Sequence, residues 1–232
     1  MARPALRNID PNLDLSRHLR TLDELPAPWD EAAVFARAAP LEVEVGSGKG
    51  LFLVAASGER PQHNFLGCEI AHKYARLAAA RLARAGRNHA VVVDGDALQL
   101  FRERLPDACA TAVHVYFPDP WWKQRHRKRR VMKPAFLADV ERVLRPEGSF
   151  HFWTDVKEYF DATVALIAEV THLLGPFAVA ERPATRPVVI HVPHDETVEP
   201  LVEVFVGRGA DRRLVTAIEV LSPANKTPGE QG

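Results

Sequence analysis

The sequence predicts an α/β fold built on a mostly parallel sheet with helices on both faces. Short apolar runs alternate with longer amphipathic stretches between about residues 41 and 174. The segments that join them are short, as in the strand–helix–strand units of a parallel sheet. The chain has 232 residues, of which 47% are hydrophobic and 26% charged, so it has an ordinary globular composition and can bury a sizeable core.

Five strands are expected in this region, each followed by a helix. The first strand ends at a glycine-rich turn, the third at an Asp-Gly-Asp turn and the fourth at a Pro-Asp-Pro turn, all of which interrupt extended structure. The expected strands are residues 41–45, 64–68, 89–93, 111–117 and 149–154. The expected helices are residues 51–57, 71–85, 98–104, 133–144 and 156–174, and a short helix precedes them at 30–38.

The two ends of the chain have a different pattern. Residues 1 to about 25 are polar and irregular and are interpreted as an arm. Prolines between residues 176 and 206 separate two β-rich pieces, near 177–181 and 201–206, which are expected to add antiparallel strands to the sheet edge and to bring the sheet to seven strands. The expected organisation is an N-terminal arm with a short helix over 1–39, one domain over 40–221 and a flexible tail over 222–232.

The charge of the chain is balanced overall but not locally. There are 30 Lys and Arg residues and 30 Asp and Glu residues, so the formal net charge is zero. Residues 123–133 hold seven of the basic residues and no acidic one, which leaves 23 basic and 30 acidic residues elsewhere. A segment of charge +7 in a background of −7 indicates a polyanionic partner.

Other features argue against a membrane or secreted protein. No stretch approaches the roughly 18 consecutive apolar residues of a membrane-spanning helix. Residues 1–10 contain no apolar run, so a secretory signal is not expected. Two cysteines, Cys68 and Cys109, are too few for a disulfide framework, which favours a cytoplasmic protein. Cys68 is expected to be a small buried hydrophobe.

Polar residues and glycines gather where the predicted strands end. Ligands of open parallel sheets bind beyond the carboxyl ends of the strands. The residues at these ends are Glu44, Gly46, Gly48 and Gly50 after the first strand, Glu69 after the second, Asp94 and Asp96 after the third, and Asp119 after the fourth. A strand-to-helix turn without a ligand stays an alternative for the glycines taken alone. The ordered series of acids favours a ligand site.

The spacing of these residues selects among nucleotide ligands. The three glycines lack the G-x-G-x-x-G spacing of dinucleotide-binding proteins, and the sequence has no phosphate-binding P-loop. A carboxylate at Glu44 would repel a phosphate but suit the ammonium or sulfonium group of S-adenosylmethionine. Glu69 lies where an acid holds ribose hydroxyls, and Asp96 lies where an adenine amino group can be met. These residues favour an adenosyl cofactor without phosphates.

A proline-bounded aspartate and two tryptophans precede the basic residues. Pro118 and Pro120 restrict the backbone around Asp119. Trp121 and Trp122 offer flat faces on which an extruded base can stack, worth roughly 1–3 kcal/mol per base. The basic residues that follow can bind phosphates and so position a nucleic acid without reading its sequence. The alternatives are a buried Trp pair and a solvated run of charge.

Five motifs occur in order along the chain. They are Val43–Gly50 (VEVGSGKG), Gly67–Glu69 (GCE), Gly95–Ala97 (GDA), Phe117–Arg130 (FPDPWWKQRHRKRR) and Thr154-Asp155. Together they resemble the motifs of the bacterial tRNA (guanine-N7-)-methyltransferase family, over about residues 41 to 160. The resemblance implies a class I S-adenosylmethionine-dependent methyltransferase fold (Rossmann-like). It also implies S-adenosylmethionine as methyl donor and N7 of a guanine in the tRNA variable loop as acceptor.

The resemblance assigns roles to the residues that match these motifs. Asp119 is implied as the catalytic residue. The implied cofactor-binding residues are Glu44, Gly46, Gly48, Glu69, Asp96 and Asp119. The implied substrate-binding residues are Lys123, Arg125, His126, Arg127, Lys128, Arg129, Arg130, Asp155 and Glu203. Two positions depart from the family pattern, since Trp122 stands where His is common and Pro200 stands where the late T-x-x-E motif has Thr.

The chemistry of guanine N7 limits what the protein must do. N7 carries a free lone pair, so methyl transfer needs no prior deprotonation and depends mainly on positioning. Asp119 can stabilise the positive charge that develops on the purine, or it can hold the guanine N1–H and exocyclic amine. Both roles stay open.

Other functions stay open as alternatives. One is an exocyclic-amine methyltransferase, whose D/N-P-P-Y/F loop is similar to Pro118–Trp121, and another is a non-catalytic RNA-binding protein on a methyltransferase scaffold. No metal is expected, because His191–Asp195 lacks a further partner at metal-site spacing. His114 and His151 lie within apolar strands and are expected to be core residues. The choice between monomer and homodimer stays open.

Overall fold

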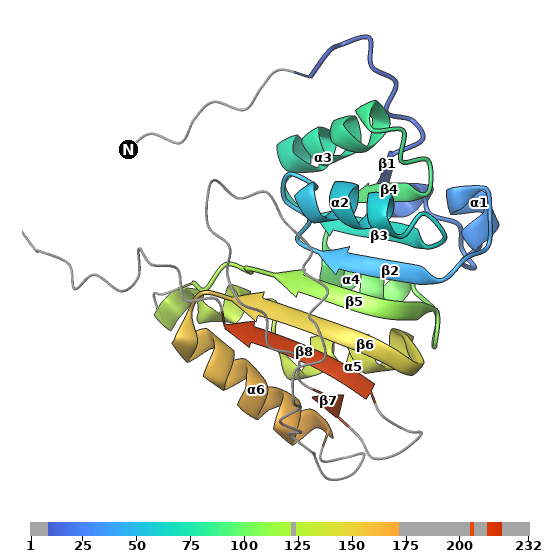
Figure 1. Ribbon diagram of the computed structural model, residues 1–232. Coiled ribbons are helices and arrows are strands. Elements are labelled where there is room, and N and C mark those ends of the chain that lie inside the picture. Colours follow the sequence, from blue (N-terminus) through green and yellow to red (C-terminus); the bar gives the residue numbers. More distant parts are fainter. Residues whose placement is uncertain (1–8, 122–123, 172–204, 207–212, 220–232) are drawn as a thin grey trace, which may run out of the picture.

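The computed structural model describes residues 9–121, 124–171, 205–206 and 213–219, in which an eight-stranded sheet carries helices on both faces (Figure 1). The strands are β1 (Leu19–Thr21), β2 (Leu41–Val45), β3 (Asn64–Glu69), β4 (Ala90–Asp94), β5 (Ala110–Tyr116), β6 (Leu144–Thr154), β7 (Phe205–Val206) and β8 (Arg213–Glu219). The α-helices are α1 (Glu31–Phe35), α2 (Leu51–Glu59), α3 (His72–Arg84), α4 (Ala97–Glu103), α5 (Pro134–Val143) and α6 (Lys157–Thr171), and two 3₁₀-helices are η1 (Leu22–Glu24) and η2 (Gln124–Arg129).

The order of the strands is β1-β4-β3-β2-β5-β6-β8-β7, and each described pairing is parallel except that of β7 with β8. Every strand and helix expected between residues 41 and 174 is present, with ends that shift by a few residues. The prediction of a mostly parallel sheet with helices on both faces is therefore confirmed.

The number of strands differs from the expected seven, and one reason is the N-terminal edge. Residues 19–21, predicted to belong to an irregular arm, form β1, which runs parallel to β4 with Leu19 opposite Val92. Leu15 is buried against Ala79 and Ala80 of α3. The prediction of an irregular arm is wrong for these residues, because a strand of three residues flanked by charges is too short to show an alternating pattern.

The other reason lies at the opposite edge of the sheet. β7 falls in the piece expected near residues 201–206 and pairs antiparallel, as predicted, with its neighbour β8. β8 itself was not predicted, and it pairs parallel to β6, with Phe152 opposite Ala217. The other expected piece, near residues 177–181, lies outside the described residues.

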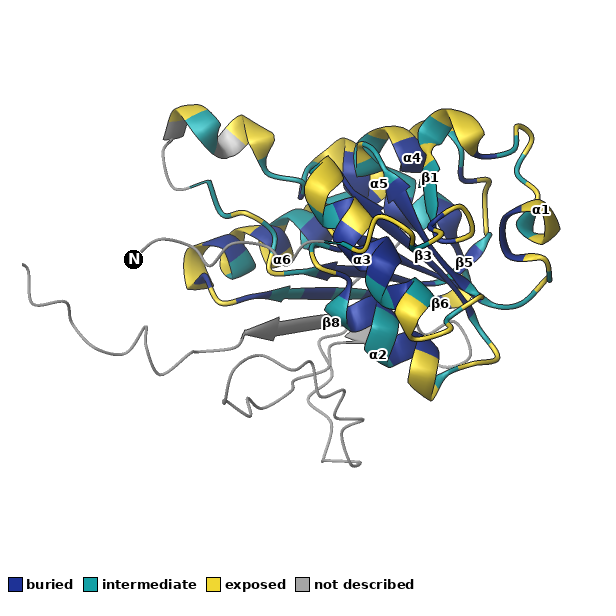
Figure 2. Cartoon of the chain, turned by 90° about the horizontal axis from the view of Figure 1, so that it is seen from above, coloured by how far each residue is buried: buried dark blue, intermediate teal, exposed yellow. Residues whose placement is uncertain are grey.

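Each face of the sheet packs a hydrophobic core of its own. Val91 and Val93 of β4 face a cluster with α1, α4, α5 and α6, whereas Ala90 and Val92 face a cluster with α2 and α3. Because both faces are covered, the central strands are buried along most of their length, as Figure 2 shows. No helix in the described segments is both long enough and apolar enough to cross a membrane.

Candidate functional site

The carboxyl ends of β2 to β6 lie at one edge of the sheet, and the described site residues predicted from sequence are found there. Glu44 lies in β2, Glu69 and Asp94 end β3 and β4, Asp96 precedes α4, and Asp119 and Asp155 follow β5 and β6. β2 lies between β3 and β5. The glycine turn (Gly46–Gly50) is therefore flanked by Glu69 on one side and by the Asp119 turn (Phe117–Trp121) on the other.

The glycine turn requires backbone angles that other residues adopt only at a cost. Gly46, Gly48 and Gly50 have φ angles of 74°, 51° and 72°. A Cβ atom on Gly50 would also lie 2.6 Å from the Cβ and 2.9 Å from the Cα of Ala78, so Gly50 lets α2 pack closely on α3. A Cβ atom on Gly46 would meet no described atom within 4 Å. The first part of the turn thus leaves open space beside the strand ends.

Glu69 fixes the glycine turn to β3 and α3. Its side chain is buried, its Oε2 accepts a hydrogen bond from the Gly48 N–H at 2.8 Å, and its Oε1 accepts one from the Ala71 N–H at 2.8 Å. The Gly46 N–H also donates to the Cys68 carbonyl at 2.8 Å. A carboxylate has about four acceptor positions, so Glu69 retains acceptors for a ligand hydroxyl.

Glu44 is a buried carboxyl group that lacks a full set of partners. It lies opposite Gly67 of β3 and His114 of β5, and it is 4% exposed. Its Oε2 atom has no hydrogen-bond partner among the described residues. Burial raises the pKa of Glu44 to about 8, and the negative charge of Glu69 adds to this effect. A cation bound beside Glu44 would stabilise its charged form.

The remaining acids of this half of the site also have partners within the protein. The Asp94 carboxylate forms a hydrogen bond with Nδ1 of His72 at the start of α3. Asp96 is exposed and its Oδ1 accepts from the Leu98 N–H at 2.8 Å, which caps α4. Cys68 is 1% exposed, as predicted for a small hydrophobe, and burial raises the pKa of its thiol.

The Asp119 turn has a strained backbone and an exposed carboxylate. Phe117 and Trp121, which bound the turn, have φ angles of 47° and 45°. Such backbone costs roughly 1–3 kcal/mol for each residue other than glycine and persists only where neighbours hold it. The Phe117 N–H donates to the Trp153 carbonyl at 2.8 Å, which ties the first end of the turn to β6. The Asp119 side chain itself is exposed.

The basic segment (residues 123–133) includes η2 and presents cations to solvent. Arg125, Lys128 and Arg129 are exposed. The Arg129 guanidinium lies over the Trp121 ring at 5.0 Å from its centre, and the His126 ring lies 5.8 Å from Trp121 in an edge arrangement. The indole on which a base was predicted to stack is thus in contact with two residues of its own segment.

Arg130 differs from these exposed cations. It is half-buried, its Nε donates to the Pro120 carbonyl at 2.7 Å, and its guanidinium lies over the Tyr159 ring at 4.5 Å from the centre. Asp155 follows β6 with an exposed side chain. Other predicted residues lie outside the described part, namely Trp122, Lys123, the side chain of Arg127, residues 191–195, Pro200 and Glu203.

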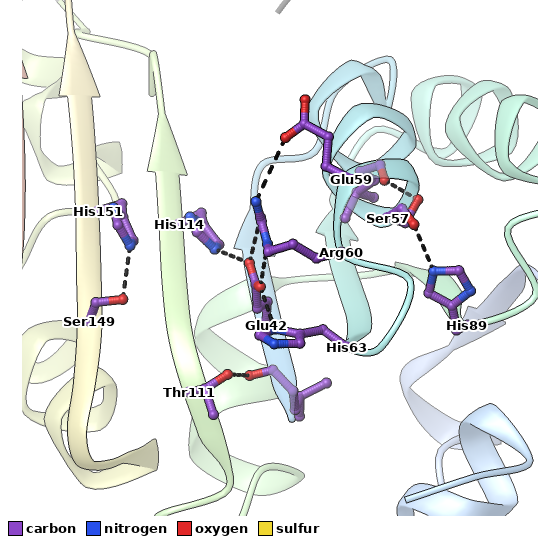
Figure 3. Close-up of polar contacts among 12 residues, drawn as sticks. Glu42, Ser57, Glu59, Arg60, His63, His89, Thr111, His114, Ser149 and His151 are labelled. Atoms are coloured by element: carbon purple, nitrogen blue, oxygen red, sulfur yellow. Dashed lines mark hydrogen bonds and ion pairs between the residues drawn. The ribbon is translucent and has the colours of Figure 1, made fainter. Parts of the chain in front are cut away.

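A buried polar network below the strand ends was not predicted. The Glu42 carboxylate accepts hydrogen bonds from Nε and Nη2 of Arg60 at 2.8 and 2.9 Å, and it contacts His63 Nδ1 at 2.7 Å and His114 Nε2 at 2.9 Å (Figure 3). Burial alone would raise the pKa of Glu42, but the bonds from His114 and Arg60 outweigh it and hold that pKa well below its usual range. An acid inside the apolar strand LEVEV was the available signal, because a buried charge requires partners.

His114 is a buried core residue, as predicted, whereas His151, also expected in the core, is only half-buried. Their rings stack with centres 4.7 Å apart, and His114 Nδ1 contacts the Tyr116 hydroxyl at 2.9 Å. Burial lowers the pKa of both, that of His151 to about 3, so both are neutral near pH 7. Tyr116 directly precedes the Asp119 turn, so this network supports the strand end from which the turn begins.

Known proteins resemble this chain over the strand ends described above. A family model described as "Putative methyltransferase" matches residues 38–183. The chain is 49% identical over 197 residues to a tRNA (guanine-N(7)-)-methyltransferase of Rhodopirellula baltica, which covers 82% of this chain and 73% of that protein. It is 34% identical over 164 residues to a tRNA (guanine-N(7)-)-methyltransferase of Sodalis glossinidius, which covers 69% of each. The residues matched by the family model include every strand end from Glu44 to Asp155.

Proposed function

This chain belongs to the tRNA (guanine-N(7)-)-methyltransferase family, and from that premise we propose that it transfers a methyl group from S-adenosylmethionine to N7 of a guanine in the variable loop of tRNA. The observation that carries the proposal is the pairing of two unlike half-sites on adjacent strands. The glycine turn and the buried Glu44 belong to β2, whereas the Asp119 turn and the basic segment follow β5. One half suits a cationic adenosyl cofactor and the other suits RNA.

The half-site on β2 fits S-adenosylmethionine chemically. The Oε2 atom of Glu44, which has no partner among the described residues, would accept a hydrogen bond from the cofactor's ammonium group. The open space at Gly46 leaves room for a ligand. Glu69 would hold ribose hydroxyls, and Asp96 would meet the adenine amino group. Bound there, the cofactor supplies an electrophilic methyl group. Gly48 is already a donor to Glu69, so its role would be to hold that carboxylate in place.

The half-site on β5 would place guanine for methyl transfer. The N7 lone pair needs no general base, so the protein contributes mainly orientation and electrostatic stabilisation. The exposed Asp119 carboxylate would lie beside the purine, where it stabilises the developing positive charge or accepts from the N1–H and exocyclic amine. The neutral side chains of His114 and His151 take no part in proton transfer on this proposal.

The basic segment would bind the phosphates of tRNA. Arg125, Lys128 and Arg129 are exposed and can reach a polyanion, and electrostatic contacts of this kind position an RNA without reading its bases. Trp121 would stack an extruded base once Arg129 turns to a phosphate. Lys123, His126, Arg127, Asp155 and Glu203 complete the proposed substrate contacts.

The decisive experiment incubates the protein with unmodified tRNA and S-adenosylmethionine labelled in its methyl group, then maps the modified nucleoside. The expected product is 7-methylguanosine at one position of the variable loop. Label on an exocyclic amine would favour the alternative enzyme. Cofactor binding by calorimetry without any transfer to tRNA would favour a non-catalytic RNA-binding protein.

A further inference from the structure

Arg130 ends the run of basic residues that the family resemblance assigns to RNA, but its environment differs from that of the exposed residues in this run. Arg125, Lys128 and Arg129 are exposed, whereas Arg130 is half-buried. Its Nε donates to the Pro120 carbonyl at 2.7 Å, a bond that spans ten residues and joins the two ends of the loop that contains η2. One side of the guanidinium is therefore used within the protein.

The second contact of Arg130 is with a fixed aromatic surface. Its guanidinium lies over the Tyr159 ring at 4.5 Å from the centre. Tyr159 is 2% exposed, belongs to α6 and packs edge-on against Phe152 of β6 at 5.8 Å between ring centres. A cation over a ring is held more strongly where water is excluded. Tyr159 thus anchors Arg130 to the core.

The residue that Arg130 holds lies next to the proposed catalytic carboxylate. Pro120 follows Asp119 directly, in a turn whose bounding residues both have left-handed backbone. The first end of that turn is tied to β6 through the Phe117 N–H and the Trp153 carbonyl. The bond from Arg130 to Pro120 restrains the other end. A turn with strained backbone needs restraint at both ends to keep one conformation.

We propose that Arg130 is a positioning residue that holds the Asp119 turn against α6, and that it is not a phosphate contact. The inference deepens the proposed function and rests on it, since the position of Asp119 matters only if Asp119 takes part in methyl transfer. It separates the exposed Arg125, Lys128 and Arg129, which bind RNA, from Arg130, which shapes the site.

The test compares two variants that separate charge from geometry. Arg130→Lys retains the charge but loses the planar guanidinium that both donates to Pro120 and lies on Tyr159. We expect its kcat at saturating tRNA to fall roughly 10- to 100-fold, because a misplaced reacting group has effects of that size. The dissociation constant for tRNA and its dependence on salt should remain as in the wild type. Arg130→Met should behave in the same way.

Two further variants provide contrast and control. Lys128→Gln should raise the dissociation constant for tRNA and reduce the slope of log affinity against log salt by about 0.7–0.9, as expected for one lost phosphate contact. Arg102→Lys makes the same substitution as Arg130→Lys at an exposed arginine of α4, outside the basic segment. It should change neither the dissociation constant for tRNA nor the salt slope. Thermal unfolding of each variant checks that the fold is intact.

A readout without catalysis keeps the inference separate from the proposed function. Arg130→Met should make trypsin cleave after Arg125 and Lys128 several-fold faster than in the wild type, whether or not the wild type methylates tRNA. The inference would be overturned if Arg130→Lys had the kcat of the wild type. It would also be overturned if Arg130→Met reduced the salt slope of tRNA binding as Lys128→Gln does, while its cleavage by trypsin stayed at the wild-type rate.

Discussion

The two half-sites hold their carboxylates by opposite means. On β2 and β3, Glu44 and Glu69 are buried, and Glu69 is fixed by two backbone N–H groups before any ligand arrives. On β5, Asp119 is exposed, and restraint acts on the backbone around it through the Trp153 carbonyl and Arg130. Burial makes the half-site on β2 and β3 sensitive to changes of charge. Backbone strain makes the Asp119 turn sensitive to changes in its geometry.

This difference predicts which substitutions should affect cofactor binding and which should affect turnover. In the half-site on β2, changes to the glycine turn should alter the stability of the free protein and changes to the buried Glu44 should alter cofactor binding. Changes in the Asp119 turn should alter turnover and leave the stability of the free protein nearly unchanged, because an exposed side chain makes little contribution to folding.

The largest expected effect comes from Asp119→Asn, which keeps the shape of the side chain and removes its charge. We expect kcat to fall by about 10²- to 10³-fold, the range seen when one electrostatic contact to a transition state is removed. Calorimetric affinity for S-adenosylmethionine and the urea midpoint should stay near wild-type values. A loss of cofactor affinity as large as the loss of kcat would mean that Asp119 binds the cofactor, and that the two half-sites do not separate cofactor binding from turnover.

The next effect is on stability and tests the construction of the glycine turn. Gly50→Ala combines left-handed backbone with a clash against the Ala78 backbone, so we expect about 2–4 kcal/mol of destabilisation. Gly46→Ala has the same backbone cost without a clash and should lose only about 1 kcal/mol. Urea unfolding of the ligand-free proteins measures both. Equal losses of unfolding free energy in the two variants would show that the close approach of α2 to α3 does not add to the cost of Gly50→Ala.

Much of this comparison could be predicted from the sequence, because its signals are local. Glu44 and Glu69 are marked by the ends of apolar runs, and the parallel sheet brings those ends to one edge. The three-residue strand β1 carried no such signal, since pairing with β4 and not its own pattern makes it a strand. The site acids were therefore predicted with their strands, while the edges of the sheet were not.

The partners of buried and half-buried charges could not be predicted from the sequence. Arg129 and Arg130 are adjacent in the sequence, yet Arg130 lies over Tyr159 of α6 and Arg129 lies over Trp121. Glu42 carries a visible signal, an acid in an apolar strand, but its partners lie 18 to 72 residues away. Contacts at such separations depend on the packing of whole elements.

A smaller effect is expected from Glu44→Gln, which removes a charge but keeps a hydrogen-bonding side chain. Affinity for S-adenosylmethionine should fall by about 30-fold, or roughly 2 kcal/mol, because a buried charge partner of the ammonium is lost. The free protein should be no less stable, since a poorly paired buried carboxyl group has been removed. Calorimetry and urea unfolding measure the two quantities.

The matched control for this variant lies two residues earlier on the same strand. Glu42→Gln should destabilise the free protein, because Arg60 and His114 lose a charged partner that they already have. If Glu44→Gln binds the cofactor as tightly as the wild type, Glu44 is not its ammonium partner.

The smallest effect is a proton that should accompany cofactor binding. The pKa of Glu44 is raised to about 8 in the free protein, above its ordinary value of 4.5, so the folded chain binds more protons than the unfolded chain between these pH values. Stability of the free protein should therefore decline as pH rises through this window. A cation beside Glu44 lowers its pKa, so binding near pH 7 should release up to about one proton, and affinity should rise less than about tenfold from pH 7 to 8.

Calorimetry in two buffers of different ionisation enthalpy counts these protons directly. The heat of binding should depend on the buffer in the wild type and depend on it less in Glu44→Gln, while Asp119→Asn should release the same number of protons as the wild type. Burial raises the pKa of Glu44 in the half-site on β2, so this half-site should couple cofactor binding to pH. Equal proton release by the wild type and Glu44→Gln would mean that Glu44 is already charged before the ligand arrives, and that burial does not distinguish the two halves.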